Sequence, residues 1–190
     1  MKQIFYHASQ TAGIKILEPR VSNQNIPLIY FSSKRENTLV YLSNAVEKYC
    51  RETGFTYDGI WSKWGSYGFT KEGILRLEEY YPNATEETYK GVSAYIYHTS
   101  LLTDAKQMED IPYAYTSDHP VETEGCEYIA DAYDAIMEAV QERKITLLKY
   151  EDMSDKMRGM IARSVAEEYK NATDHPEYQY FLREKFSIQL

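Results

Sequence analysis

The chain has 190 residues, of which 19 are tyrosine, and its formal net charge is -8 at pH 7. This length suits a single domain with one buried core, and the mean hydropathy of -0.58 excludes the membrane-protein classes. The negative charge disfavours a nucleic-acid partner, because it would repel the phosphate backbone. No basic patch opposes it in the sequence, where the longest basic grouping is the pair Arg143-Lys144. The start of the chain lacks the apolar stretch of a secretory signal, so we expect a cytoplasmic protein that has no membrane association.

The sequence predicts no metal site and no disulfide. Cys50 and Cys126 are far apart and have no CxxC partner, so we expect both to be reduced. The common nucleotide, hydrolase and zinc signatures are absent. The histidines are scattered without the spacing of metal ligands: His7, His98, His119 and His175.

The first elements expected are two strands that can pair. Residues 3–8 read as a short strand, and LIYFSS at 28–33 reads as a second one, rich in aromatic and β-branched residues. A polar loop over residues 22–27 separates them.

A helix is predicted next, over residues 34–52. Ser33 and Glu36 have the spacing of a capping box, and an apolar series follows them. The glycine-rich stretch at 54–69 indicates irregular structure or short strands around a turn, and a second helix is predicted near 71–80.

The second half predicts further strands and helices, which together favour an α+β fold. Strand-like patterns recur at 92–101, 111–117, 126–133 and 145–150. Helices are predicted from Asp131, from Ser154 to Asn171, and after Pro176. Four residues are assigned to the core on composition and helical spacing: Trp61, Trp64, Met157 and Met160. Because the strands do not alternate with helices in a βαβ repeat, a wound parallel sheet is not expected.

Two short motifs have chemical potential. The first, Tyr6-His7-Ala8-Ser9, places a histidine at a strand end beside a small residue with an accessible backbone. The second, Ile29-Tyr30-Phe31-Ser32, leads into a helix on which Thr38 and Tyr41 share a face. Taken alone, each motif is more typical of an ordinary core strand than of a site.

Taken together, the two motifs resemble the signature of the ADP-ribosyltransferase fold, in its diphtheria-toxin and poly-ADP-ribose-polymerase branch. Thr38 and Tyr41 stand eight and eleven residues after Tyr30, which are the family's offsets. The resemblance implies an ADP-ribosyltransferase-like split β-sheet over residues 1–150 of a single domain, with a C-terminal helical extension over 151–190.

The resemblance also implies roles for the motif residues in binding NAD as a substrate. His7 would hydrogen-bond the ribose, and the backbone of Ala8, helped by Thr38, would bind the nicotinamide carboxamide. Tyr30 and Tyr41 would sandwich the nicotinamide ring. Ser9 completes the motif at the strand end, and the family's glycine is replaced here by alanine.

The family's third element is a Glu, Asp or Gln at the start of a later strand. In the glutamate version it anchors the ribose 2′-hydroxyl and stabilises the positive charge that develops as nicotinamide leaves. Glu127 in CEYIADAY is the first candidate and Glu122 in PVETEG is the second. Arg20 is the candidate for contacting the pyrophosphate.

The sequence therefore predicts an NAD-dependent ADP-ribosyltransferase whose acceptor is a protein or small molecule rather than nucleic acid. Two alternatives remain open at this point. One is a non-catalytic relative that keeps the NAD cleft or only the fold and acts as a protein-binding module. The other is a small accessory or phage-borne protein whose acidic face and C-terminal helices bind a protein partner.

Overall fold

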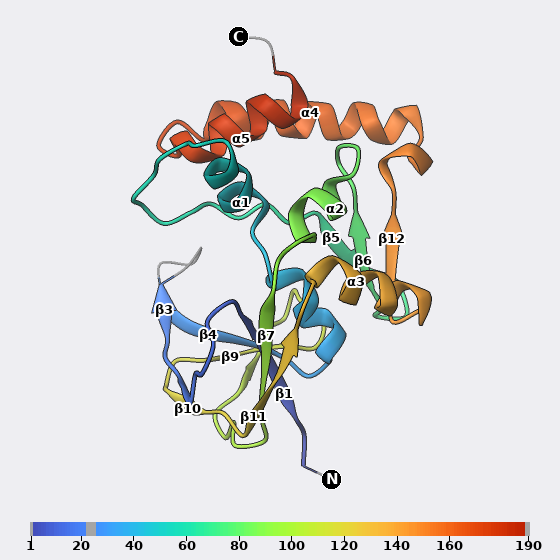
Figure 1. Cartoon of the computed structure of the whole chain (residues 1–190). Helices are drawn as coiled ribbons and strands as arrows, with labels where there is room; N and C mark the ends of the chain where they lie inside the picture. Colours follow the sequence, from blue (N-terminus) through green and yellow to red (C-terminus); the bar gives the residue numbers. More distant parts are fainter. Residues whose placement is uncertain (1, 22–25, 189–190) are drawn as a thin grey trace.

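The computed structural model describes residues 2–21 and 26–188, and it shows an α+β fold (Figure 1). In this part of the chain the strands form a seven-stranded, a three-stranded and a two-stranded sheet. None of the described helices is long and apolar enough to cross a membrane. Residues 22–25 of the predicted loop lie outside the described residues.

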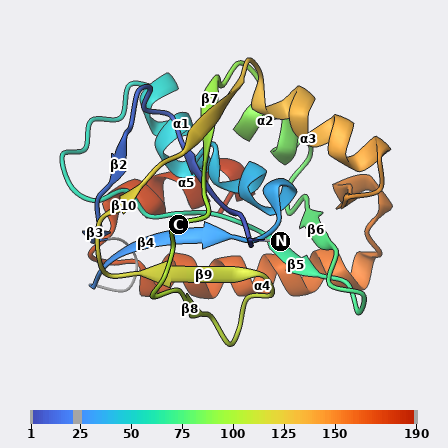
Figure 2. The ribbon, with the colours of Figure 1, turned by 90° about the horizontal axis from the view of Figure 1, so that it is seen from below.

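The seven-stranded sheet is antiparallel at every pairing and has the order β11-β7-β1-β4-β9-β8, with β3 joined to β4. Figure 2 shows the neighbouring strands β4, β9 and β8. Its strands are β1 (Phe5–Ser9), β3 (Arg20–Val21), β4 (Pro27–Ser32), β7 (Ala94–Thr99), β8 (Lys106–Gln107), β9 (Ala114–Ser117) and β11 (Gly125–Ile129). The predicted pairing of the first two apolar runs is confirmed, since Tyr6 of β1 lies opposite Ser32 of β4.

Strand β1 pairs fully with one neighbour and only briefly with the other, and this difference positions the candidate site. Strand β1 pairs with β7 along its whole length, from Phe5 opposite Thr99 to Ser9 opposite Tyr95. Its pairing with β4 is limited to Tyr6 and Ser32. Beyond that point β1 and β4 therefore separate, and their facing backbone groups need other partners.

The two smaller sheets lie beside the large one. Strands β2 (Ile16–Leu17) and β10 (Val121–Glu122) form the first, whose buried Leu17 and Val121 pack with Phe5 and Phe31. The second has β6 at its centre, antiparallel to β5 and parallel to β12: β5 (Tyr67–Phe69), β6 (Leu75–Glu78) and β12 (Ile145–Leu148).

The helices divide between two cores. The 3₁₀ helix η1, α2 and α3 contribute with β6 and β7 to the main core, whereas α1, α4 and α5 pack together at the end of the molecule away from β1 (Figure 1). Their bounds are η1 (Arg35–Tyr41), α1 (Ala45–Glu52), α2 (Ala84–Tyr89), α3 (Ala132–Gln141), η2 (Tyr150–Asp152), α4 (Asp155–Asn171) and α5 (Pro176–Phe186). Helix α5 shares its core with α1, so the predicted extension is joined to the N-terminal half of the chain.

The predicted helix over 34–52 is wrong as a single element. It is divided into η1 and α1, and α1 has its own N-cap, Asn44, whose side chain accepts a hydrogen bond from the backbone N–H of Val46. The predicted capping box is also wrong, because Lys34 occupies the N-cap position of η1 and makes no side-chain capping bond.

Two further predictions are wrong for identifiable reasons. Residues 71–80 contain β6 instead of a helix, because Leu75 and Leu77 alternate with the exposed Arg76 and pair with β12. Met157 and Met160 are exposed, at 37% and 54%, because α4 turns its Ile161 and Val165 face toward the core instead.

The remaining elements agree with the predictions. Strands at 92–101, 111–117, 126–133 and 145–150 and the helices from Asp131, Ser154 and Pro176 are all present. Asp131 and Ser154 cap their helices through side-chain oxygens. Trp61 and Trp64 pack against the core of α1, α4 and α5.

Candidate functional site

His7 occupies the place where β1 and β4 separate. Its Nδ1 lies 2.8 Å from the carbonyl oxygen of Tyr30. A carbonyl oxygen can only accept, so Nδ1 carries the proton and donates it. Burial lowers the pKa of the imidazole, the Tyr30 carbonyl opposes this shift, and the positive charges of Arg20 and Lys63 lower the pKa further. His7 is therefore neutral at pH 7, and its Nε2 is left as a hydrogen-bond acceptor.

Ala8, Ser9 and Tyr30 lie next to this histidine. Ala8 is half-buried and packs against the main core, and the hydroxyl of Ser9 accepts a hydrogen bond of 3.1 Å from the backbone N–H of Thr11. Tyr30 is half-buried on β4. The structure thus brings His7, Ala8, Ser9 and Tyr30 together at one end of β1.

Glu127 lies two strands away, on the edge strand β11. It is opposite Ile96 of β7, which is in turn opposite Ala8 of β1. Two strand spacings put the Cα atoms of Glu127 and Ala8 about 10 Å apart. Because residues directly opposite one another point to the same face of a sheet, Glu127 shares a face with Ala8, whereas the His7 side chain points to the other face.

The carboxylate of Glu127 is held by Arg35, the first residue of η1. Arg35 Nε lies 2.7 Å from Oε2 and Nη2 lies 2.6 Å from Oε1. These hydrogen bonds lower the pKa of the Glu127 carboxyl. The carboxylate is therefore ionised at pH 7, and its charge is balanced by the guanidinium.

Thr38 and Tyr41 are held by contacts within the protein. Thr38 is 2% exposed, and its hydroxyl donates to the carbonyl of Arg35 over 2.6 Å. Tyr41 is 47% exposed, and its hydroxyl lies 2.6 Å from that of Tyr67 on β5. The two tyrosine rings are nearly perpendicular, at 88°. The Thr38 hydroxyl is thus already bonded, whereas the ring of Tyr41 remains accessible.

Arg20 and Glu122 lie on different strands, β3 and β10. Arg20 is on β3, opposite Leu28 of β4, and Leu28 lies two positions before Tyr30 on that strand. The positive charge of Arg20 contributes to the lowered pKa of His7. Glu122 is an exposed residue of β10, opposite Ile16 in the two-stranded sheet. Among the described residues, no hydrogen bond or ion pair joins Glu122 to His7, Ala8, Ser9 or Tyr30.

Tyr67 and Lys63 are residues that the sequence did not predict for this region. Both belong to the glycine-rich stretch at 54–69. Its composition predicts irregular structure or short strands, but it does not predict where the individual side chains lie. The stretch is held by Ser62, whose carbonyl accepts from Asn44 Nδ2 over 2.9 Å. The Ser62 hydroxyl also donates to Oε1 of the buried Glu177 over 2.7 Å.

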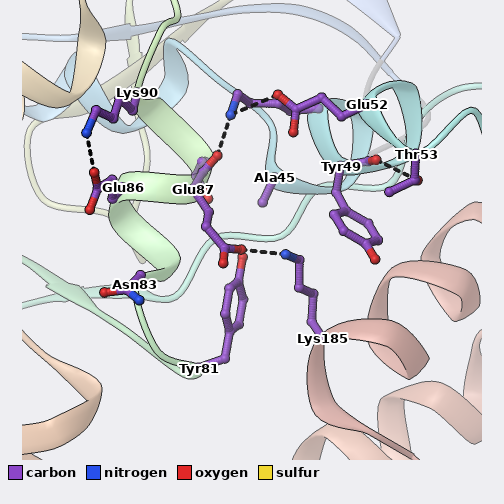
Figure 3. Close-up of a pocket in the computed structure, with 12 residues that line it drawn as sticks. Ala45, Tyr49, Glu52, Thr53, Tyr81, Asn83, Glu86, Glu87, Lys90 and Lys185 are labelled. Carbon is purple, nitrogen blue, oxygen red and sulfur yellow. Dashed lines mark hydrogen bonds and ion pairs between the residues drawn. The ribbon is translucent and has the colours of Figure 1, made fainter.

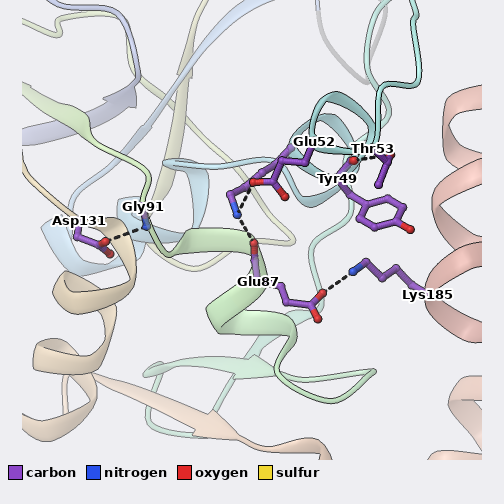
Figure 4. Close-up of polar contacts among 8 residues, drawn as sticks. Tyr49, Glu52, Thr53, Glu87, Gly91, Asp131 and Lys185 are labelled. Atoms are coloured by element: carbon purple, nitrogen blue, oxygen red, sulfur yellow. Dashed lines mark hydrogen bonds and ion pairs between the residues drawn. The ribbon is translucent and has the colours of Figure 1, made fainter.

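A separate cavity of about 600 Å³ lies between α1, α2 and α5 (Figure 3). The Lys185 ammonium lies 4.1 Å from the ring centre of Tyr49 and pairs with the Glu87 carboxylate. Lys48 Nζ lies 2.5 Å from the Glu87 carbonyl and 3.1 Å from the Glu52 carboxylate (Figure 4). Both lysines bind groups of the protein itself, and their contacts across the cavity join α1, α2 and α5.

No protein-family model, curated protein or solved structure matches the chain.

Proposed function

We propose that the protein is an NAD-dependent ADP-ribosyltransferase, which moves ADP-ribose from NAD to an acceptor and releases nicotinamide. The observation that carries the proposal is the hydrogen bond from His7 Nδ1 to the Tyr30 carbonyl, where β1 and β4 separate. It fixes a neutral imidazole whose Nε2 can accept a hydrogen bond from a ribose hydroxyl, beside the backbone of Ala8. The separation of these strands is also what supports a split-sheet arrangement of the ADP-ribosyltransferase type.

The proposed reaction breaks the bond between the anomeric carbon of the ribose and the ring nitrogen of nicotinamide. The electron pair stays on nicotinamide, which leaves neutral, and a nucleophilic atom of the acceptor bonds to the anomeric carbon and loses its proton. Because Glu127 and His7 point to opposite faces of the sheet, the ribose must lie at the end of β1 for both side chains to reach it. There the ionised Glu127 would stabilise the positive charge that develops on the ribose. Because Arg35 balances that charge in the structure described here, at least one of its hydrogen bonds must open as the substrate binds.

The other residues of the region have complementary roles in the proposal. The half-buried Tyr30 and the exposed ring of Tyr41 would flank the nicotinamide ring. Arg20, with Lys63 from the glycine-rich stretch, supplies positive charge near His7 that suits the pyrophosphate. The net charge of -8 favours a protein or small molecule over nucleic acid as the acceptor.

The experiment is a measurement of nicotinamide release from NAD by the wild type, Glu127→Gln and Glu122→Gln. Loss of the Glu127 charge is expected to reduce the rate by about 100-fold or more, as removal of one stabilising group in an active site typically does. Glu122→Gln makes the same chemical change on β10 and is expected to match the wild type. Equal rates for wild type and Glu127→Gln would refute the role of Glu127.

A second candidate, favoured by the engagement of Glu127 with Arg35, is a non-catalytic module that binds NAD and a protein partner. NAD in large excess would then raise the melting temperature without release of nicotinamide, because a ligand that binds the folded state stabilises it. The absence of both release and stabilisation would refute any NAD site.

A further inference from the structure

Both oxygens of the Glu127 carboxylate are bonded to a single side chain, that of Arg35. Nε of Arg35 lies 2.7 Å from Oε2, and Nη2 lies 2.6 Å from Oε1. The planar guanidinium thus binds the carboxylate at two points and balances its charge. In this closed arrangement the carboxylate has neither its full charge nor a free orientation to offer a substrate.

The contact can open without a change in the backbone of η1. The side chains of Arg35 and Glu127 are 36% and 48% exposed, so both can be reached from solvent. The interior of η1 is buried and packs against β1, β4 and α3. Rotation of the Arg35 side chain alone is therefore enough to release the carboxylate.

Other negative charges act on the guanidinium besides that of Glu127. The hydrogen bond to Glu127 is the largest cause of the raised pKa of Arg35, burial opposes it, and the charges of Glu127, Glu138 and Glu36 raise the pKa further. Glu36 is the next residue of η1, and Glu138 is exposed on α3, which packs against η1. The positive charge therefore remains partly compensated within the protein when the contact opens.

We infer that the contact between Arg35 and Glu127 is autoinhibitory: it keeps the carboxylate from the substrate, and the reaction proceeds only in molecules in which it is open. The inference rests on the proposed function, and it concerns the regulation of that site. A partly exposed ion pair favours the closed arrangement by about fourfold, so about one molecule in five is open.

Removal of Arg35 leaves the chemistry of Glu127 intact. An ordinary glutamate carboxyl titrates about three pH units below neutrality, so Glu127 stays ionised at pH 7 without the guanidinium. We therefore expect Arg35→Gln to release nicotinamide about fivefold faster than the wild type at saturating NAD. If Arg35 served only to orient a productive carboxylate, the same substitution would slow the reaction.

The test measures kcat for nicotinamide release in the wild type, Arg35→Gln, Arg35→Lys and the double variant Arg35→Gln/Glu127→Gln. Arg51→Gln is the control, because Arg51 forms an exposed pair with Glu47 inside α1, and it should match the wild type. Arg35→Lys keeps the charge but loses the two-point contact, so its rate should lie between those of the wild type and Arg35→Gln. The double variant should be as slow as Glu127→Gln, because the gain acts through that carboxylate.

Salt provides a readout that a merely structural role of Arg35 would not change. Salt screens an exposed ion pair, so kcat of the wild type and of Arg51→Gln should rise by about two- to threefold between about 50 and 500 mM NaCl. Arg35→Gln has no such contact to weaken, and its kcat should not rise with salt.

The outcomes separate the inference from the function on which it rests. If the wild type releases nicotinamide and Arg35→Gln is no faster, the inference is overturned and the proposed function stands. A faster Arg35→Gln that keeps the salt dependence of the wild type would overturn it as well. Should Arg35→Gln fail to fold, judged by its melting curve, Arg35→Lys decides in the same way. If neither the wild type nor Arg35→Gln binds NAD or releases nicotinamide, the proposed function fails and the inference fails with it.

Discussion

Arg35 and Glu127 stand 92 positions apart in the sequence and meet through two hydrogen bonds of 2.7 and 2.6 Å. The contact joins the start of η1 to the edge strand β11. Its two-point geometry fixes the orientation of the carboxylate as well as its charge.

Arg35→Ala is expected to destabilise the protein by about 0.5–1 kcal/mol at neutral pH, because the pair is partly exposed and screened by solvent. The folded state lowers the pKa of Glu127, so the contribution is present above the ordinary carboxyl range and is lost as the pH falls through the folded pKa. Urea unfolding at pH 7 and pH 3 should therefore show a difference between wild type and variant that shrinks at pH 3. An equal difference at both pH values would contradict a charge-based contact.

His7 should make the free energy of unfolding depend on pH at and below pH 6.5. Its folded pKa lies below the ordinary value of 6.5, so the unfolded chain binds the proton more readily. The contribution of His7 to the free energy of unfolding is then fully present above pH 6.5, and it declines as the pH falls from 6.5 toward the folded pKa. In His7→Gln, unfolding free energies measured between pH 7.5 and pH 5 should decline less than in the wild type. The same slope in both proteins would show that the imidazole is not buried in this way.

Arg20 and Lys63 should act on His7 through their charge. Removing either positive charge, in Arg20→Gln or Lys63→Gln, is expected to raise the pKa of His7, measured by the NMR titration of its ring protons. Lys170→Gln, at the exposed end of α4, is the control and should leave that titration unchanged. No change in Arg20→Gln would remove Arg20 from the proposed site.

Ser62 should stabilise the glycine-rich stretch through Glu177, whose side chain is fully buried. Ser62→Ala removes the 2.7 Å hydrogen bond to Glu177 Oε1 and leaves this buried carboxylate less satisfied, so we expect a loss of about 1–3 kcal/mol in chemical unfolding. The exposed Ser93 offers a matched control, and Ser93→Ala should stay within about 0.5 kcal/mol of the wild type. A cost for Ser62→Ala no larger than for Ser93→Ala would contradict this role.

Lys185 should hold α5 against α1 and α2. Its ammonium lies 4.1 and 5.3 Å from the ring centres of Tyr49 and Tyr81 and pairs with Glu87, and Lys185→Met removes these interactions while keeping most of the chain length. We expect a loss of about 1–2 kcal/mol in thermal or urea unfolding. Lys170→Met tests the same replacement at an exposed position, where no comparable loss is expected.

Local signals in the sequence located most elements correctly. Asp131 and Ser154 were recognised as helix starts because their side chains can bond the first backbone N–H groups, and these bonds are present. The prediction of a helix at 71–80 was wrong because leucine and glutamate, which recur from Leu75 to Glu79, favour a helix. The pairing of this segment with β12 makes it a strand instead.

The candidate site was predictable only in the part that is local in sequence. His7, Ala8 and Tyr30 were found because they belong to two short motifs that together resemble the ADP-ribosyltransferase signature, and the strands that carry these motifs pair with each other. The bonds from Arg35 to Glu127 and from Tyr41 to Tyr67 join segments 92 and 26 positions apart, and no sequence spacing encodes such contacts.

The parallel pairing of β6 with β12 affects the order in which the molecule can assemble during synthesis. Thr146 of β12 bonds the carbonyl of Leu75, 71 positions earlier, so the nascent chain must be made almost to the start of α4 before β6 gains this neighbour. All strands of the large sheet precede β12 in the chain and can pair first. Bringing such distant segments together has an entropic cost that slows folding. The large sheet, with His7 and Glu127 on it, is therefore available as a template before the three-stranded sheet closes beside it.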